Sequence, residues 1–383
     1  MSEKKIEPLS AEDLFKRLRS DPSLFILDVR NEEDYKSWRI EDIETPETLN
    51  IPYIDFIEAP EEVIPKVPKD REVVALCGKG GASDYVADIL RKKGYNAVNV
   101  TGGMKAWGAV YSRVTVWREG SRKVMQFNRV GKGCLSYIIV SGSEAAVVDP
   151  SRHIDQYLSF LEDEGLELKY IFDTHLHADH ISGAAALCKA TGAGYYLSAD
   201  DMDGASAQYV ALKDKQQFSI GSSSIKIVAL RSPGHTPGST CALFDDKVLF
   251  TGDTLFISSM GRPDLGGQAE IWVRDLFRTI SRLRKLPDNT LILPSHTRGG
   301  KDYDRNGVVS RSLDEIRKSN PLMTVEDEEE FAGQILKNLP EEPSAYQKMR
   351  KANLGLLEPD EEKMEQWELG KNRCAIEQAK EKS

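Results

Sequence analysis

A cluster of histidine residues constrains this chain more than any other feature of its sequence. Residues 175–180, His-Leu-His-Ala-Asp-His, place three imidazoles and one carboxylate within six positions. The apolar run at 170–172 predicts a buried strand, so the cluster is expected on a loop at the end of that strand. Few folds without a metal ion need so many ligating side chains in one short loop. The cluster therefore predicts a metal centre in a globular domain.

Three further candidate ligands lie far along the chain, each at or shortly after the end of an apolar run. They are His235, Asp253 and His296. If the strands run parallel there, their ends meet at one edge of a sheet, and the side chains form one cage. Five of the six histidines fall in these motifs, and a metal centre explains that concentration.

The same ligands allow a centre with two ions. In that arrangement Asp253 bridges the ions, and the centre makes hydroxide and hydrolyses esters or thioesters. The first ion would be held by His175, His177 and His235, and the second by Asp179, His180 and His296.

The ligands also allow a centre with one ion. His175, His235 and Asp253 would then form a face of two histidines and one carboxylate with open positions. Such a face suits Fe(II) and dioxygen, whereas Zn(II) has no redox chemistry. The remaining residues would orient the ligands and tune their charge, and they are His177, Asp179, His180 and His296. The ligands alone do not choose between one ion and two.

A second candidate site is a cysteine on a glycine-rich loop. Cys77 follows an apolar run at 73–76 and precedes a predicted helix. Backbone N–H groups and the positive end of the helix would favour a thiolate, which is a nucleophile and can carry a persulfide. The predicted cradle consists of Gly78, Lys79, Gly80, Gly81, Ala82 and Ser83. The competing interpretation is a glycine-rich turn with an incidental cysteine.

Length and composition exclude several classes of protein. A chain of 383 residues is expected to form two or three domains. A net charge of -10 argues against a nucleic-acid surface, and a small anionic substrate would need a local basic pocket. No apolar run approaches the roughly 18 residues that span a membrane. Five cysteines without a CxxC pair suggest free thiols in the cytoplasm. The sequence leaves open whether the chain forms a homo-oligomer.

The pattern of apolar and charged residues divides the chain into four segments. Residues 1–112 alternate short apolar and helical runs, which is typical of an α/β domain. The charge mix of 113–124 suggests a linker, and a short strand there is equally possible. Residues 125–320 form a second α/β domain with more strand. Residues 321–383 hold 15 acidic and 9 basic residues and predict a peripheral acidic extension with one docked helix.

Several segments together resemble known families. Residues 27–30, Leu-Asp-Val-Arg, the Cys77 loop and residues 101–107, Thr-Gly-Gly-Met-Lys-Ala-Trp, resemble a rhodanese domain in order and spacing. From residue 126 to about 318, the metal-ligand motifs resemble the metallo-β-lactamase superfold. These resemblances imply an open parallel sheet with flanking helices, then an αββα sandwich and a short helical C-terminal extension.

Residues 260–265, Met-Gly-Arg-Pro-Asp-Leu, resemble persulfide dioxygenases of this superfold. The resemblance implies one Fe(II) per chain and oxidation of a low-molecular-weight thiol persulfide, such as glutathione persulfide, with O2 to sulfite and free thiol. The dioxygenase resemblance also implies that Arg262 faces the substrate, and Arg298 stands where the mitochondrial-type enzymes have a tyrosine. The rhodanese resemblance implies sulfur transfer through a persulfide of Cys77, with sulfite or thiosulfate as partners.

Two departures keep alternatives open. Rhodaneses that use thiosulfate usually carry an arginine where this chain has Ala82, so the rhodanese domain could be a non-catalytic sulfur carrier or sensor. The domain order is the reverse of that in many dioxygenase and rhodanese fusions. The other alternative is a binuclear zinc thioesterase, similar to glyoxalase II, with an accessory rhodanese. The carrier thiol and the direction of sulfur flow stay open.

Overall fold

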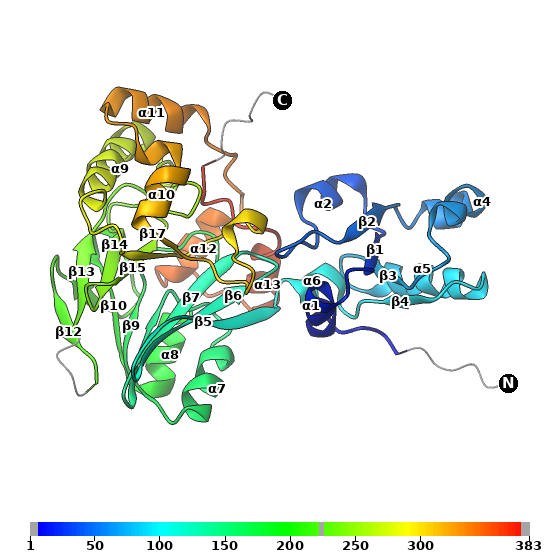
Figure 1. Ribbon diagram of the computed structural model, residues 1–383, viewed down its shortest axis with the longest axis horizontal. Coiled ribbons are helices and arrows are strands. Elements are labelled where there is room, and N and C mark those ends of the chain that lie inside the picture. Colours follow the sequence, from blue (N-terminus) through cyan, green and yellow to red (C-terminus); the bar gives the residue numbers. More distant parts are fainter. Residues whose placement is uncertain (1–6, 222–225, 377–383) are drawn as a thin grey trace.

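The computed structural model describes residues 7–221 and 226–376. A smaller N-terminal domain and a larger domain lie side by side along the long axis of the molecule (Figure 1). The predicted N-terminal domain and C-terminal extension include residues 1–6 and 377–383, which lie outside the described residues. Within the described ranges, no helix combines the length and the apolar composition that a membrane crossing requires.

The N-terminal domain is built on a parallel sheet, as predicted, and its four strands have the order β2-β1-β3-β4. The strands are β1 (Phe25–Asp28), β2 (Glu47–Asn50), β3 (Val73–Leu76) and β4 (Ala97–Asn99). The main helices are α1 (Ala11–Ser20), α2 (Glu32–Ser37), α3 (Asp55–Glu58), α4 (Pro60–Val63), α5 (Gly81–Lys92) and α6 (Gly103–Trp107). Successive side chains of β1 enter opposite cores, Phe25 and Leu27 on one face and Ile26 on the other. β1 and β3 are therefore buried throughout.

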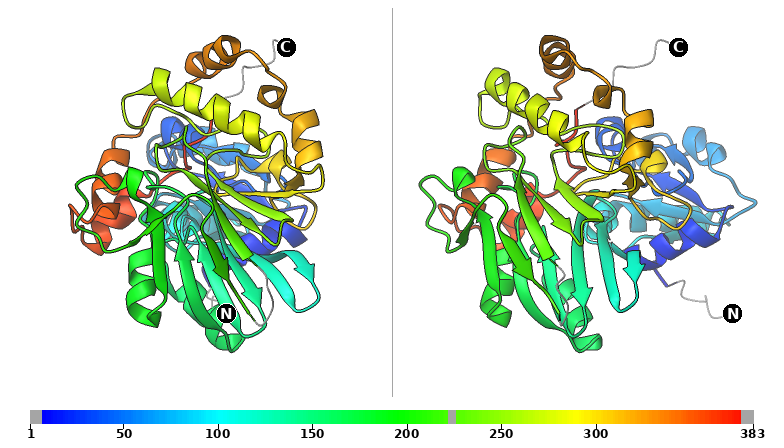
Figure 2. Two further views of the ribbon diagram at one scale, coloured as in Figure 1. Left: turned by 90° about the vertical axis from the view of Figure 1, so that its left-hand side faces the viewer. Right: turned by 60° about the vertical axis from the view of Figure 1, so that its left-hand side comes forward.

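The larger domain consists of two facing sheets with helices on their outer faces. The seven-stranded sheet has the order β11-β10-β9-β8-β7-β6-β5, and the six-stranded sheet has the order β12-β13-β14-β15-β16-β17. In Figure 2 the green helices α7 (Asp155–Asp163) and α8 (Ala184–Thr191) lie outside the first sheet, and the yellow helices α9 (Ala269–Leu283) and α10 (Leu313–Ser319) lie outside the second. The predicted αββα sandwich is confirmed.

The strands of the first sheet are β5 (Tyr111–Glu119), β6 (Arg122–Arg129), β7 (Cys134–Ser141), β8 (Glu144–Val148), β9 (Glu167–Phe172), β10 (Gly194–Ser198) and β11 (Val210–Leu212). Those of the second are β12 (Gln217–Ser219), β13 (Lys226–Arg231), β14 (Thr240–Phe244), β15 (Val248–Gly252), β16 (Leu291–Pro294) and β17 (Arg311–Ser312). The main core lies between the sheets, where the rings of Tyr137 and Phe250 are 5.1 Å apart.

Residues 113–124 lie in β5, in β6 and in the turn between them, so the strand that the sequence also allowed is found in place of the linker. β5 and β6 pair antiparallel around a turn at Gly120, which adopts a φ of 59°. β5 is an edge strand, and charged side chains such as Arg118 face solvent. An edge strand needs few apolar residues, and this composition resembles that of a linker.

The C-terminal extension forms α11 (Glu328–Lys337), α12 (Tyr346–Asn353) and α13 (Glu361–Trp367). α11 is the predicted docked helix, because Phe331 packs on Phe277 of α9 with ring centroids 5.4 Å apart. α12 lies against the histidine loop of the larger domain, and α13 lies at the junction of the two domains (Figure 1), where Glu365 pairs with Lys105. Cys374 is fully buried in the larger domain. The prediction of a peripheral extension is wrong for this part, since its acidic composition describes only its exposed faces.

Close backbone contacts hold the two domains together. The indole N–H of Trp38 donates to the carbonyl oxygen of Gly131 at 2.6 Å, and Arg129 Nε donates to the carbonyl oxygen of Gly108 at 2.6 Å. A Cβ at Gly131 would lie 2.6 Å from the carbonyl oxygen of Trp107, so only glycine fits this approach. The domains therefore meet at a packed interface.

Candidate metal centre and cysteine site

The metal ligands predicted from the sequence all follow strand ends at one edge of the sandwich. The histidine cluster follows β9, while His235, Asp253 and His296 follow β13, β15 and β16. β14 is antiparallel to both β13 and β15, and β15 is parallel to β16, so β13, β15 and β16 run in one direction. Their C-terminal ends therefore lie at the same edge, which is the arrangement that the cage requires.

His175, His235 and Asp253 come together in a buried group. Asp253 Oδ2 lies 3.7 Å from His175 Nε2 and 3.5 Å from His235 Nε2, and the three atoms all lie within 4.8 Å of one another. None of these three buried atoms has a hydrogen-bond partner among the described residues. Leaving three buried polar atoms unpaired is costly, and an ion between them would satisfy all three. The residues present thus fit a metal of the two-histidine, one-carboxylate type.

The other nitrogen of each ligand histidine is held in place. His235 Nδ1 donates to the carbonyl oxygen of Arg262 at 2.8 Å, and His175 Nδ1 lies 2.9 Å from Thr174 Oγ1. Burial lowers the pKa of His175 and of His235, so both rings are neutral at pH 7. Neutral imidazoles are the form that binds a metal ion.

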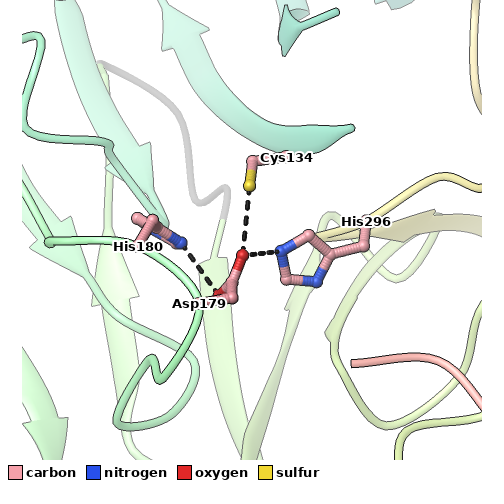
Figure 3. Close-up of side chains that lie close together, drawn as sticks. All are labelled: Cys134, Asp179, His180 and His296. Atoms are coloured by element: carbon pink, nitrogen blue, oxygen red, sulfur yellow. Dashed lines mark hydrogen bonds and ion pairs between the residues drawn. The ribbon is translucent and has the colours of Figure 1, made fainter. Parts of the chain in front are cut away.

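A second group surrounds Asp179 (Figure 3). Its carboxylate contacts His296 Nε2 at 2.8 Å, His180 Nδ1 at 3.1 Å and Cys134 Sγ at 3.1 Å. His296 Nδ1 lies 2.6 Å from Asp253 Oδ1, so one imidazole joins the Asp179 and Asp253 carboxylates. Burial would lower the pKa of His296, but these two carboxylates outweigh it and raise that pKa well above its usual value. The His296 imidazole thus holds Asp253 in place beside the first group.

His177 lies outside the group formed by His175, His235 and Asp253. Its Nε2 atom bonds to Asp149 Oδ1 at 3.1 Å. Burial opposes the charged ring, yet the Asp149 carboxylate outweighs it and raises the pKa of His177 well above its usual value. Two other buried nitrogens, Nδ1 of His177 and Nε2 of His180, also lack partners among the described residues. In the two-ion arrangement, His177 Nδ1 would be available to the first ion and His180 Nε2 to the second.

Sequence reasoning missed three residues that complete the centre. Cys134 contacts Asp179, and the ligand atoms of Cys374, Asp253 and His296 all lie within 4.8 Å of one another. Asn353 Nδ2 donates to the carbonyl oxygens of His177 and His180, at 2.8 and 2.9 Å. Cys134, Cys374 and Asn353 share no local sequence motif with the histidines. Asn353 and Cys374 lie in the extension, so they could be found only once the extension was seen to fold back onto the larger domain.

Glu368 is a buried carboxylate that ties the histidine loop to the rest of the molecule. It accepts from Ile181 N at 2.8 Å, Arg152 Nε at 2.9 Å and Arg129 Nη1 at 2.7 Å. Burial would raise the pKa of Glu368, but the two arginines outweigh it and lower that pKa to about 2 from an ordinary value of 4.5. The backbone N–H of Ile181, the residue after His180, is thus held by the Glu368 carboxylate at the C-terminal end of α13.

Glu368→Gln is expected to destabilise the fold by about 3 kcal/mol at pH 7, because it leaves the buried Arg129 guanidinium without its counter-charge. The lowered pKa means that the carboxylate stabilises the fold fully above pH 4.5 and loses this effect as the pH falls toward about 2. The advantage of the wild type in urea unfolding should therefore shrink over that range. Glu365→Gln, which loses only a surface pair with Lys105, is the control, and equal losses in both variants would contradict the assignment.

Cys77 lies at the C-terminal end of β3, before the first turn of α5. Its Sγ atom accepts from Gly80 N at 3.1 Å and from Ser83 Oγ at 3.3 Å. Gly80 adopts a φ of 95°, and a Cβ on Gly103 would lie 2.1 Å from the Cys77 carbonyl oxygen, so two glycines shape the loop. Of the predicted cradle, Gly80 and Ser83 contact the sulfur, while Gly78, Lys79 and Gly81 are exposed and Ala82 is half-buried.

The two predicted substrate-binding arginines differ in their surroundings. The guanidinium of Arg262 is buried, pairs with Asp264 at 2.7 Å and donates to the carbonyl oxygen of Pro340 at 2.6 Å. These bonds fasten the extension beside the centre, and a contact of Arg262 with substrate stays a prediction. Arg298 is exposed and lines a cleft beside His296.

The two domains match two different protein families. The profile of the Metallo-beta-lactamase superfamily matches residues 129–296, and the profile of the Rhodanese-like domain matches residues 10–110.

Three relatives show that this chain is similar both to hydrolases and to a persulfide dioxygenase. The chain is 32% identical over 202 residues to a probable polyketide biosynthesis zinc-dependent hydrolase of Bacillus velezensis, with 51% of this chain and 84% of that protein covered. It is 38% identical over 157 residues to a hydroxyacylglutathione hydrolase of Methylococcus capsulatus, with 41% and 58% covered. It is 35% identical over 190 residues to the mitochondrial persulfide dioxygenase ETHE1 of Bos taurus, with 49% and 69% covered.

Proposed function

Since the chain belongs to the metallo-β-lactamase superfamily and carries a rhodanese-like domain ahead of it, we propose that it is an iron-dependent persulfide dioxygenase with a sulfur-transfer site. The metal site oxidises a low-molecular-weight thiol persulfide according to R–S–SH + O2 + H2O → R–SH + SO3²⁻ + 2 H⁺. Sulfane sulfur is carried by Cys77.

The three unpartnered atoms of His175, His235 and Asp253 carry this proposal. Two neutral imidazoles and one carboxylate leave open positions that suit Fe(II), which supplies the redox chemistry for dioxygen, whereas Zn(II) has none. His296 fixes Asp253 from behind, and the Arg262 carbonyl fixes His235. These bonds preorganise the three ligands on rigid strand ends.

Metal analysis together with oxygen uptake tests the proposal. Protein purified without added metal is expected to contain about one iron per chain and to consume O2 with glutathione persulfide, because the three ligand atoms form one site. A hydroxyacylglutathione thioester is the control substrate, and the protein should not hydrolyse it. Two zinc ions per chain, with thioester hydrolysis and no oxygen uptake, would sink the proposal.

The second candidate function is a binuclear zinc hydrolase with an accessory rhodanese-like domain. The unpartnered nitrogens of His177 and His180 favour it, because two ions would need more ligands than His175, His235 and Asp253 provide. The names of the zinc-dependent and hydroxyacylglutathione hydrolases among the relatives agree with it. Asp179, His180 and His296 also fit it, because their ligand atoms lie within 4.8 Å of one another in a buried group.

For the N-terminal domain we propose a persulfide of Cys77 held by Gly80 N and Ser83 Oγ. Ala82 provides no charge for a thiosulfate anion, so a thiol-bound persulfide is the favoured sulfur donor. Loading Cys77 with sulfane sulfur and following its transfer to cyanide or sulfite separates turnover from a carrier role: a label that stays on Cys77 would make the domain a carrier.

A further inference from the structure

A cleft of about 230 Å³ beside the metal centre is lined by cationic side chains. Arg298, Lys371 and Arg373 contribute to its wall, and no acidic residue is among the described residues that line it. On a chain with a net charge of -10, such a concentration of positive charge is local. It is the basic pocket that a small anion would need.

The cleft adjoins the metal centre through the backbone on two sides. Thr297 follows His296 directly, and Ala375 follows Cys374, whose sulfur belongs to the group with Asp253 and His296. An anion in the cleft would therefore lie close to the backbone that carries His296 and Cys374.

A second, smaller cleft continues from the first toward the N-terminal domain. It shares Thr297, Arg298 and Lys371 with the first, and it adds Arg39 and Trp107 from the N-terminal domain. Trp107 ends α6, and the helix begins at Gly103, which packs on the Cys77 carbonyl. α6 therefore links the wall of the second cleft to the backbone of the Cys77 loop, while the Trp107 and Cys77 side chains pack in different cores on the two faces of the sheet.

Two of the guanidinium groups have unused hydrogen-bonding capacity. The Arg373 side chain is exposed and has no hydrogen-bond or ion-pair partner among the described residues, and Arg298 Nη1 makes a single bond of 3.3 Å to the carbonyl oxygen of Ile376. Lys371 pairs with Glu41, which also pairs with Arg39. Arginine forks match the oxygen atoms of compact anions.

We propose that this cleft binds a sulfur oxyanion, sulfite or thiosulfate, beside the metal centre. The inference rests on the proposed function for the source of sulfite. The step served is Cys77–S–S⁻ + SO3²⁻ → Cys77–S⁻ + S2O3²⁻. The S–S bond of the cysteine persulfide breaks and leaves its electron pair on Cys77, while the outer sulfur forms a new S–S bond with sulfite. In the reverse direction the same cleft presents thiosulfate.

The binding test uses the full-length chain with its metal, under argon, in a buffer of low ionic strength. Calorimetric titration with sulfite and with thiosulfate is expected to give one site per chain, and Arg373→Gln should weaken at least one of them by about tenfold or more. Arg118→Gln, an exposed arginine on β5, is the control and should bind as the wild type does. No binding, or equal weakening in both variants, would overturn the proposal.

Two kinetic arms distinguish the sources of the anion. If sulfite from the metal centre is the ligand, Arg373→Gln lowers the ratio of thiosulfate to free sulfite formed from a persulfide and O2. If thiosulfate from solution is the ligand, the variant raises the KM for thiosulfate in transfer to cyanide more than it lowers kcat. Binding needs no oxygen, so a chain that binds the anion but consumes no O2 refutes only the proposed function. A chain that consumes O2 and binds neither anion refutes only this inference.

Discussion

Asp253→Ala is expected to remove the metal ion and to lower persulfide-dependent oxygen uptake by more than about 100-fold. Asp253 supplies the only carboxylate of the ligand group and also anchors His296. Changes in groups that merely orient ligands already cost about 10- to 100-fold, and here a ligand is lost. Sulfur transfer through Cys77 should be retained, because that loop belongs to another domain. Iron analysis and an oxygen electrode measure the first effect, and transfer to cyanide measures the second.

The matched control for Asp253→Ala is Asp203→Ala, which removes an exposed carboxylate with no partner among the described residues. It should keep full iron content and oxygen uptake. If Asp253→Ala retained both iron and activity, the group of His175, His235 and Asp253 would not be the metal site.

Cys77→Ser is expected to have the opposite pattern. It should lower sulfur transfer by at least about 1,000-fold, because a serine hydroxyl is neither a thiolate nor a persulfide carrier and loss of a nucleophile is among the most costly changes. Oxygen uptake from a free persulfide should be unchanged. Cys188→Ser, at a half-buried cysteine on α8, is the control.

The pair of variants also tests the independence of the two sites. A loss of oxygen uptake in Cys77→Ser with a free persulfide would contradict separate sites and would mean that sulfur must pass through the N-terminal domain first. The two variants mixed in equal amounts should show each activity at about half the wild-type level per chain.

Local patterns were sufficient to predict much of the fold and both sites. The His-x-His-x-Asp-His motif, the cysteine on its glycine loop and the distant His235, Asp253 and His296 were found because each follows an apolar run, and strand ends meet at a sheet edge. Hydrophobic periodicity also predicted the parallel sheet of the N-terminal domain, since buried strands such as β3 are apolar throughout.

Contacts between distant segments could not be read from local patterns. Asn353 and Glu368 lie in an acidic stretch, and nothing near them in the sequence indicates that they bond to the backbone of the histidine loop. Cys134 begins β7, and its contact with Asp179 depends on how two sheets meet. β5 was mistaken for a linker because one face of an edge strand is polar.

The bonds of Asn353 and Glu368 also bear on the order of events during protein synthesis. The metal ligands predicted from the sequence, which span residues 175–296, leave the ribosome before these two residues do, so the histidine loop emerges without the amide and the carboxylate that hold it. The loop reaches its final shape only after Asn353 and Glu368 have folded back onto it. A metal ion is therefore expected to bind more firmly to a chain in which residues 353–368 have docked than to one in which they have not.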